Sequence, residues 1–131
     1  MKEHAAELQA SRRRSKDPAV RAAEEEQAVV EKIAELDEGD RALAEKVHAL
    51  VKSATSLTGK LWYGMPAWAK DGRIVVFFQP ADKFKARYST LGFNDAARLD
   101  DGTMWPTSYA LTTITKADET RIAELLKRAA G

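Results

Sequence analysis

The chain has 131 residues and a formal net charge of +1, with 44% hydrophobic and 31% charged residues, so we expect an ordinary globular protein rather than a disordered one. It contains no cysteine and two histidines, which excludes disulfides and thiolate chemistry and leaves little for a zinc site. No apolar run is long enough to span a membrane, and no signal-peptide core follows Met1, so we expect a cytoplasmic protein with no membrane partner.

The N-terminal segment is basic. Residues 1–16 alternate small and charged side chains and end in Arg12-Arg13-Arg14-Ser15-Lys16. This pattern predicts a basic N-terminal arm or a frayed helix. We expect the remaining residues, 17–131, to form a single domain.

Two helices are predicted next. Asp17 and Pro18 form a typical helix start, because Asp accepts hydrogen bonds from the free N–H groups and Pro fits the first helical turn. This helix is expected to end near Leu36. Asp40 is expected to cap a second helix, in which apolar side chains recur at helical spacing as far as Ala54.

The pattern changes from helical to extended near residue 60. Asp71 and Gly72 lie between two β-prone runs and predict a tight two-residue hairpin. Apolar and basic side chains alternate in residues 84–89, which predicts a third strand with a basic outer face. A fourth strand is expected at residues 104–111.

The last element is a helix. Thr115 and Asp118 have the spacing of a capping box, with Asp in place of the usual Glu. Helices followed by consecutive strands and one more helix indicate an α+β fold. We therefore expect a two-layer sandwich, with the N-terminal helices and the C-terminal helix packed on an antiparallel sheet of about four strands.

The central block contains an ordered series of short motifs. They are Tyr63-Gly64-Met65-Pro66, Leu91-Gly92-Phe93-Asn94-Asp95, Leu99-Asp100-Asp101-Gly102 and Met104-Trp105-Pro106-Thr107. In this order they resemble the YdhG-like family of small bacterial proteins over residues 28–129. The resemblance implies a frataxin-like sandwich and the role of an intracellular iron chaperone. Many members place Lys-Lys-His-x-x-x-Tyr-Pro where this chain has residues 83–90 without histidine, so no role of that histidine is carried over.

The acidic first helix supplies the candidate metal ligands. Residues 20–40 carry eight acidic and two basic side chains. Hard cations prefer oxygen ligands, and the resemblance makes weakly held Fe(II) the expected cofactor. The alternative is a solvent-facing helix that is kept soluble by its charge. The candidate ligands fall on one face of an ideal helix and are Glu24, Glu31, Glu35 and Glu38.

The aromatic block is the second candidate site. All ten aromatic residues lie between Trp62 and Tyr109, and residues 60–88 carry six basic against two acidic side chains. Such a face could stack bases and track phosphates, hold a small anionic ligand or receive a partner protein. The alternative is that the aromatic rings fill the core. The candidate ligand-binding residues are Trp62, Tyr63, Met65, Trp68, Lys85, Arg87, Tyr88 and Trp105.

Catalytic motifs are missing from the sequence. It has no nucleophile elbow, no phosphate-binding glycine loop and no paired-histidine metal motif, so we expect no enzyme activity. Two hypotheses follow. One is an iron chaperone that presents its metal to an unknown protein partner. The other is a non-enzymatic binding module, for which nucleic acid is the less favoured partner. We expect a monomer or a weak homodimer. Aromatic rings that line an open cleft would favour the binding module, and full burial of the rings would favour the metal protein.

Overall fold

The computed structural model describes residues 16–131 and has an α+β architecture of three helices and a five-stranded antiparallel sheet. The α+β prediction is confirmed, with one more strand than expected. The predicted N-terminal arm lies outside the described residues except for Lys16. No helix within residues 16–131 has the length and apolar character needed to cross a membrane. In chain order the elements are α2 (Pro18–Ala34), α3 (Glu38–Ala54), β1 (Thr58–Gly59), β2 (Ala67–Lys70), β3 (Arg73–Gln79), β4 (Ser89–Phe93), β5 (Ser108–Leu111) and α4 (Lys116–Ala130).

The strands follow one another across the sheet in the order β1-β2-β3-β4-β5, and each neighbouring pair is antiparallel. The predicted hairpin between β2 and β3 is confirmed. Asp71 has a φ of 51° and Gly72 a φ of 79°, the positive values that a two-residue turn matching the strand twist requires. The two edge strands of this sheet are β1 and β5.

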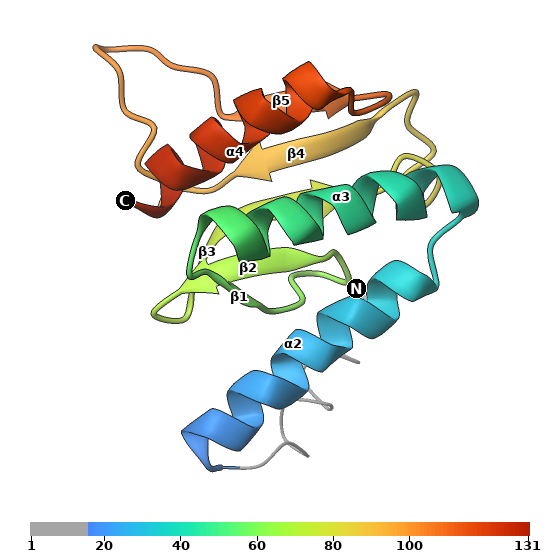
Figure 1. The fold of residues 1–131 in the computed structure, drawn as a ribbon, viewed down its shortest axis with the longest axis vertical. Coiled ribbons are helices and arrows are strands. Elements are labelled where there is room, and N and C mark those ends of the chain that lie inside the picture. Colours follow the sequence, from blue (N-terminus) through green and yellow to red (C-terminus); the bar gives the residue numbers. More distant parts are fainter. Residues whose placement is uncertain (1–15) are drawn as a thin grey trace.

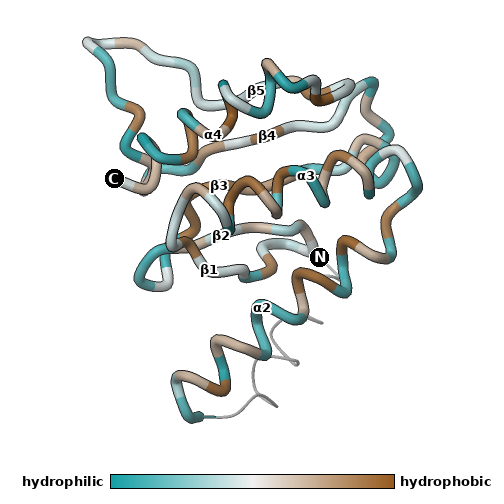
Figure 2. Tube along the Cα trace, in the orientation of Figure 1, coloured by the Kyte–Doolittle hydropathy of each residue, from teal (hydrophilic) through white to brown (hydrophobic). Residues whose placement is uncertain are grey.

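The helices cover one face of this sheet. Figure 1 shows α3 and α4 side by side over the strands, whereas α2 lies beside β1 at the edge and also contacts α3. Hydrophobic positions concentrate on the central strands and on the helices above them, and the connecting loops are mostly hydrophilic (Figure 2). The side chains of Trp68, Phe78 and Leu91 are fully buried in this layer. Buried residues from α2 to α4 join in one hydrophobic core.

Strand β3 contains a bulge that adds a side chain to the core. The register between β2 and β3 shifts after Trp68, so that Trp68 pairs with Val76 but Ala69 pairs with Ile74. Val75 is the extra residue. Val75 and Val76 are both buried, because a bulge can turn two successive side chains toward the same face.

The helix starts use different caps. The carboxylate of Asp17 accepts hydrogen bonds from the first-turn amides of α2, and Thr115 and Asp118 form the predicted capping box of α4. The prediction for Asp40 is wrong. The N-cap of α3 is Asp37, and Asp40 lies buried within the first turn with its carboxylate directed to the loop before β4.

The predicted strand at residues 84–89 is also wrong. Residues 81–85 form tight turns, in which the Lys85 amide donates to the Asp82 carbonyl at 3.2 Å and the Ala86 amide to the Ala81 carbonyl at 2.9 Å. Lys85 has a φ of 54°, which a strand does not allow. The alternating pattern reflects an exposed loop, and β4 begins only at Ser89.

Candidate functional site

A tight turn opens the aromatic block. Trp62 and Met65 exchange two backbone hydrogen bonds of 3.0 Å, and the residues between them, Tyr63 and Gly64, have φ values of 51° and 78°. The turn buries Met65 and exposes 48% of the Tyr63 side chain. Within the described chain every peptide bond is trans, including the one before Pro66, whose isomer the sequence left open.

The Trp62 ring packs on the sheet face that the helices leave uncovered. Its partners are Phe77, with ring centroids 5.0 Å apart, and Tyr63, at 5.1 Å in an edge-to-face arrangement. Phe77 points away from the helices because it alternates with the core residues on either side of it in β3. Gly92 pairs with Phe77 across the strands, and a Cβ atom at this position would overlap the Phe77 ring. Glycine therefore lets the rings lie close against the sheet.

The loop between β3 and β4, residues 81–88, is fixed by one buried carboxylate. The two oxygens of Asp40 accept hydrogen bonds from the Asp82 amide, at 3.0 Å, and from the Ser89 hydroxyl, at 2.9 Å. The same hydroxyl accepts the Ala81 amide at 3.2 Å. Asp40 thus bonds to residues at both ends of the loop. Sequence reasoning missed this role, because nothing near Asp40 indicates partners more than forty residues away.

One further contact holds the loop. The Lys83 ammonium donates to the Gly64 carbonyl at 3.3 Å and so joins the loop to the tight turn. On the other side, the carboxyl groups of Asp37 and Asp82 lie together, and hydrogen bonding to Asp82 and repulsion from its charge raise the pKa of Asp37.

The loop and the turn together present rings and cations to solvent. Phe84 and Tyr88 are 44% and 36% exposed. The Lys83 ammonium lies 5.7 Å from the Phe84 ring centroid, and the Arg87 guanidinium 5.2 Å from that of Tyr88. We call this region the aromatic–basic surface; its residues are Tyr63, Lys83, Phe84, Lys85, Arg87 and Tyr88.

The structure places some of the eight predicted ligand-binding residues at the surface and others in the interior. Four of them lie on the aromatic–basic surface, and Trp62 lies half-buried beside it. Trp68 and Met65 are buried in the interior and cannot reach a ligand, so those two assignments are wrong. Trp105 is half-buried and packs against the core. The predicted ligand-binding residues do not include Phe84, although it lies in the alternating segment for which the sequence predicts a strand. The four on the surface are Tyr63, Lys85, Arg87 and Tyr88.

A chain of polar contacts beneath α2 gives the buried Trp68 indole a hydrogen-bond partner. The Trp68 indole N–H donates to His48 Nδ1 at 3.1 Å, and His48 Nε2 lies 3.7 Å from a carboxylate oxygen of Glu26. The other oxygen of Glu26 accepts the Gly59 amide at 2.6 Å and the Lys52 ammonium at 3.2 Å. The chain joins α2, α3 and the first two strands.

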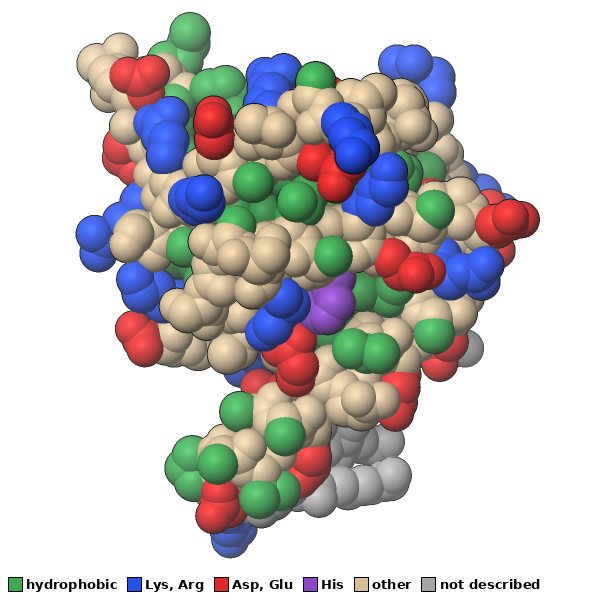
Figure 3. Space-filling model, viewed as in Figure 1, with side chains coloured by type: hydrophobic (Ala, Val, Ile, Leu, Met, Phe, Trp, Pro, Cys, Tyr) green, Lys and Arg blue, Asp and Glu red, His purple; other side chains and the backbone are tan. Residues whose placement is uncertain are grey.

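His48 also borders a shallow groove of about 350 Å³ between α2 and α3, which Figure 3 shows with a histidine beside apolar side chains. Burial lowers the pKa of His48, the Glu26 carboxylate opposes that shift, and Lys52 adds to it. Both ring nitrogens already face partners, Trp68 and Glu26. The arrangement therefore serves to position α2 on the sheet.

The four candidate metal ligands are not on one helix face. Glu24 and Glu31 lie on α2, Glu35 is its C-cap, and Glu38 begins α3. Glu31 accepts a hydrogen bond from Gln27 at 3.5 Å, and Glu35 forms an ion pair with Lys32 at 3.6 Å. Within residues 16–131 no three histidine or carboxylate side chains converge as a metal-binding group. Iron binding at these glutamates stays a prediction.

Replacing Asp40 with Asn is expected to lower the free energy of unfolding by about 2 kcal/mol, because one of the two buried donors loses its acceptor oxygen. Urea denaturation measures this loss, and faster hydrogen exchange of the Asp82 amide reports loosening of the loop. Glu38→Gln is the control, since it removes an exposed carboxylate from the same helical turn and should change stability by less than about 0.5 kcal/mol. Equal losses in both variants would contradict the anchoring role of Asp40.

The free energy of unfolding is expected to fall as the pH drops below about 6.5, the ordinary pKa of histidine. Folding lowers the pKa of His48, so the neutral imidazole stabilises the folded state. This contribution is complete above the pKa of His48 in the unfolded chain and is lost as the pH falls through its pKa in the folded protein. Urea denaturation of the wild type and His48→Asn at pH 7.5 and pH 5.5 tests this. The wild type should lose more stability between the two pH values than the variant, and equal losses would refute the assignment.

Comparison with models of protein families, with curated proteins and with solved structures gave no match for this chain. The resemblance to YdhG-like proteins therefore stays a prediction from the motifs. What the chain binds is inferred from the geometry of its own residues.

Proposed function

We propose that the chain is a non-enzymatic binding protein that holds an anionic partner on its aromatic–basic surface, and that single-stranded nucleic acid is the ligand class this surface fits best. The observation that carries the proposal is the pairing of cations with exposed rings in one loop, Lys83 over Phe84 and Arg87 over Tyr88. Proteins that bind single strands stack bases on aromatic rings and follow the phosphates with neighbouring cations.

The anchoring of the loop supports the same function. The bonds from Asp40 to Asp82 and Ser89, together with the bond from the Ala81 amide to the Ser89 hydroxyl, hold the rings in place before any ligand arrives. A surface ordered in advance loses less conformational entropy on binding than a loop that must be fixed by its ligand. The Lys83 bond to Gly64 brings Tyr63, a third exposed ring, next to the loop.

The electrostatics of the region favour an anion. Three cations lie on the loop against one acidic residue, Asp82, whose amide donates to Asp40 and whose carboxyl group lies beside that of Asp37. The strongly acidic helix α2 lies at the β1 edge. Unlike charges on separate regions of one molecule orient an anionic partner toward the basic region.

Arg87→Ala is expected to weaken binding of a fluorescently labelled oligothymidine and to reduce the salt dependence of binding by about one phosphate contact. Tyr88→Ala should cost roughly 1–3 kcal/mol of binding free energy through lost base stacking. Fluorescence anisotropy at several salt concentrations measures both effects.

The matched control is Arg128→Ala, which removes the same charge from an exposed position on α4. Lys70 at the Asp71–Gly72 end of β2 bonds to the end of α4, so Arg128 lies at the end of the sheet away from the β3–β4 loop. This variant should bind like the wild type. Equal weakening by Arg87→Ala and Arg128→Ala, or no binding at low salt, would refute the nucleic-acid form of the proposal.

Weak binding of ferrous iron is the second candidate function. The observation that favours it is the exposure of Glu31 and Glu35, which lie four residues apart at the end of α2. In an anaerobic amide NMR titration, Fe(II) should perturb residues 24–40 and Mg(II), as the control, should not. The lack of a selective effect of Fe(II) there would remove this candidate.

A further inference from the structure

The two edge strands of the sheet, β1 and β5, differ in how they are covered. β1 has only two residues, lies against α2, and its Gly59 amide donates to the Glu26 carboxylate. β5, residues Ser108–Leu111, has β4 on one side, and no strand of the described residues 16–131 lies on the other. It carries no proline and no charged side chain, the usual devices by which proteins protect an exposed edge.

The register gives the direction of the backbone groups of β5. The Phe93 amide donates to the Thr107 carbonyl at 2.8 Å, which makes these residues a hydrogen-bonded pair. Hydrogen-bonded and non-hydrogen-bonded pairs alternate along an antiparallel ladder. Because Ser108 and Ala110 fall at the intervening positions, their N–H and C=O groups point away from β4. Within the described chain no backbone group pairs with them.

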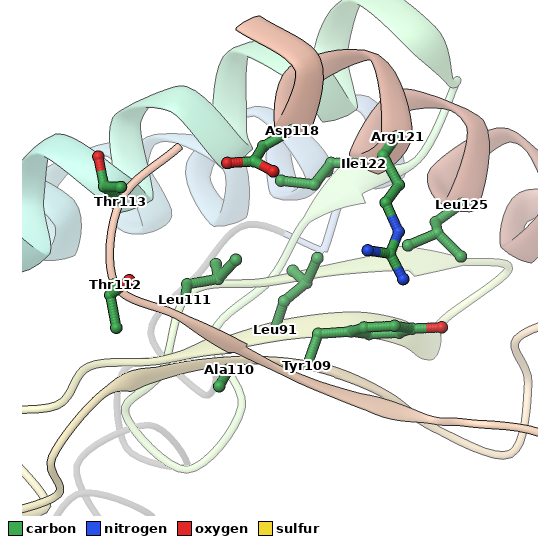
Figure 4. Close-up of a pocket in the computed structure, with 10 residues that line it drawn as sticks. All are labelled: Leu91, Tyr109, Ala110, Leu111, Thr112, Thr113, Asp118, Arg121, Ile122 and Leu125. Atoms are coloured by element: carbon green, nitrogen blue, oxygen red, sulfur yellow. The ribbon is translucent and has the colours of Figure 1, made fainter. Parts of the chain in front are cut away.

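A pocket of about 280 Å³ lies between this edge strand and α4. Figure 4 shows the side chains of Tyr109 and Leu111 directed toward α4, whereas Ala110 points away from it. Both apolar and polar side chains line the pocket, and the charged ones are Asp118 and Arg121 of α4 (Figure 4). The volume is below the roughly 300–1,000 Å³ of pockets that hold whole small molecules, and it suits one apolar side chain. The apolar lining consists of Leu91, Leu111, Ile122 and Leu125.

The rim of the pocket carries a cation. The Arg121 guanidinium lies 5.9 Å from the Tyr109 ring centroid and, among residues 16–131, forms no ion pair within 4.0 Å. Asp118, also on the rim, accepts the Thr115 amide at 2.9 Å in the capping box, and its hydrogen bonds with Thr115 and, to a smaller extent, the charge of Arg121 lower the pKa of its carboxyl group. Arg121 therefore offers its donors to a carboxylate from outside the chain, in a region where Asp118 is held in the helix cap.

We propose that an extended peptide adds to β5 as a sixth strand, with an apolar side chain in the pocket and a carboxylate two residues away on Arg121. Main-chain bonds to Ser108 and Ala110 would supply affinity, as in other cases where a peptide extends a sheet. Side chains two residues apart in a strand share a face, so both recognition elements reach the α4 side together. This site is separate from the aromatic–basic surface and does not depend on its function.

Two acetylated and amidated peptides test the proposal, Thr-Leu-Thr-Glu-Thr and Thr-Glu-Thr-Leu-Thr, which cover both strand directions. In an amide NMR titration at least one should shift the Ser108 and Ala110 amides and slow their hydrogen exchange. The matched control peptides carry Gln in place of Glu, and Arg121→Gln should weaken binding of the Glu peptides roughly tenfold, to the level of the Gln peptides.

Pairing between the backbones of β5 and the peptide is tested by a change in the protein and by a change in the peptide. Ala110→Pro removes only an outward amide and no ladder bond, so the sheet should persist while peptide binding is lost. If this variant does not fold, peptides N-methylated at alternate residues make the same test on the wild type. Undiminished binding of the N-methylated peptides would overturn the proposal. So would full competition by isovalerate, which would indicate a small-molecule site, or protection of Ser108 and Ala110 in a peptide-free dimer, which would indicate a second copy of the chain.

Discussion

One-sided coverage of the sheet is the constraint on which the structure depends. Because α3 and α4 lie on the same face, alternate residues of every strand must supply the core, and the bulge at Val75 adds one more apolar side chain to it. Among residues 16–131, no helix packs on the opposite face. Trp62 and Phe77 pack together there, and Gly92 provides the room they need. The tight turn, the ring cluster and the loop beside them all follow from this division.

Buried and half-buried polar groups fix the relation of the helices to the sheet. Asp40 joins α3 to the β3–β4 loop, and Glu26 and His48 join α2 to β1 and β2. Asp40, Glu26 and His48 each bond to specific groups of the protein in place of water. Removing one partner of any of these bonds therefore lowers the free energy of unfolding. Such bonds have a direction that apolar packing lacks, and they hold the exposed rings of Phe84 and Tyr88 at one place on the surface.

The sequence predicted the features that depend on neighbouring residues. The start of α2, the capping box of α4 and the Asp71–Gly72 turn are confirmed, because local backbone and side-chain chemistry determines them. The strand predicted at residues 84–89 is wrong, because alternation does not distinguish a strand from an exposed loop that Asp40 holds from a distance.

The candidate site was predicted only in part, because contacts between distant residues decide which of its side chains are exposed. Composition pointed to the aromatic block, but burial separates its residues: Trp68 donates to His48 in the interior, whereas Tyr88 is exposed. The glutamates on α2 and α3 were expected on one face of an ideal helix. α2 ends at Ala34 and α3 begins at Glu38, and the two helices run in different directions. Periodicity in the sequence does not predict the direction of α3 relative to α2.

The unequal edges of the sheet also limit how the molecule can assemble. A sheet open at both sides can stack strand against strand without end, as fibres do. Among residues 16–131, α2 and Glu26 occupy the β1 side, and β5 is the open edge. Strand pairing between two copies at β5 would join these edges across a twofold axis and leave neither to extend the array. Pairing of this kind would end the sheet after one addition.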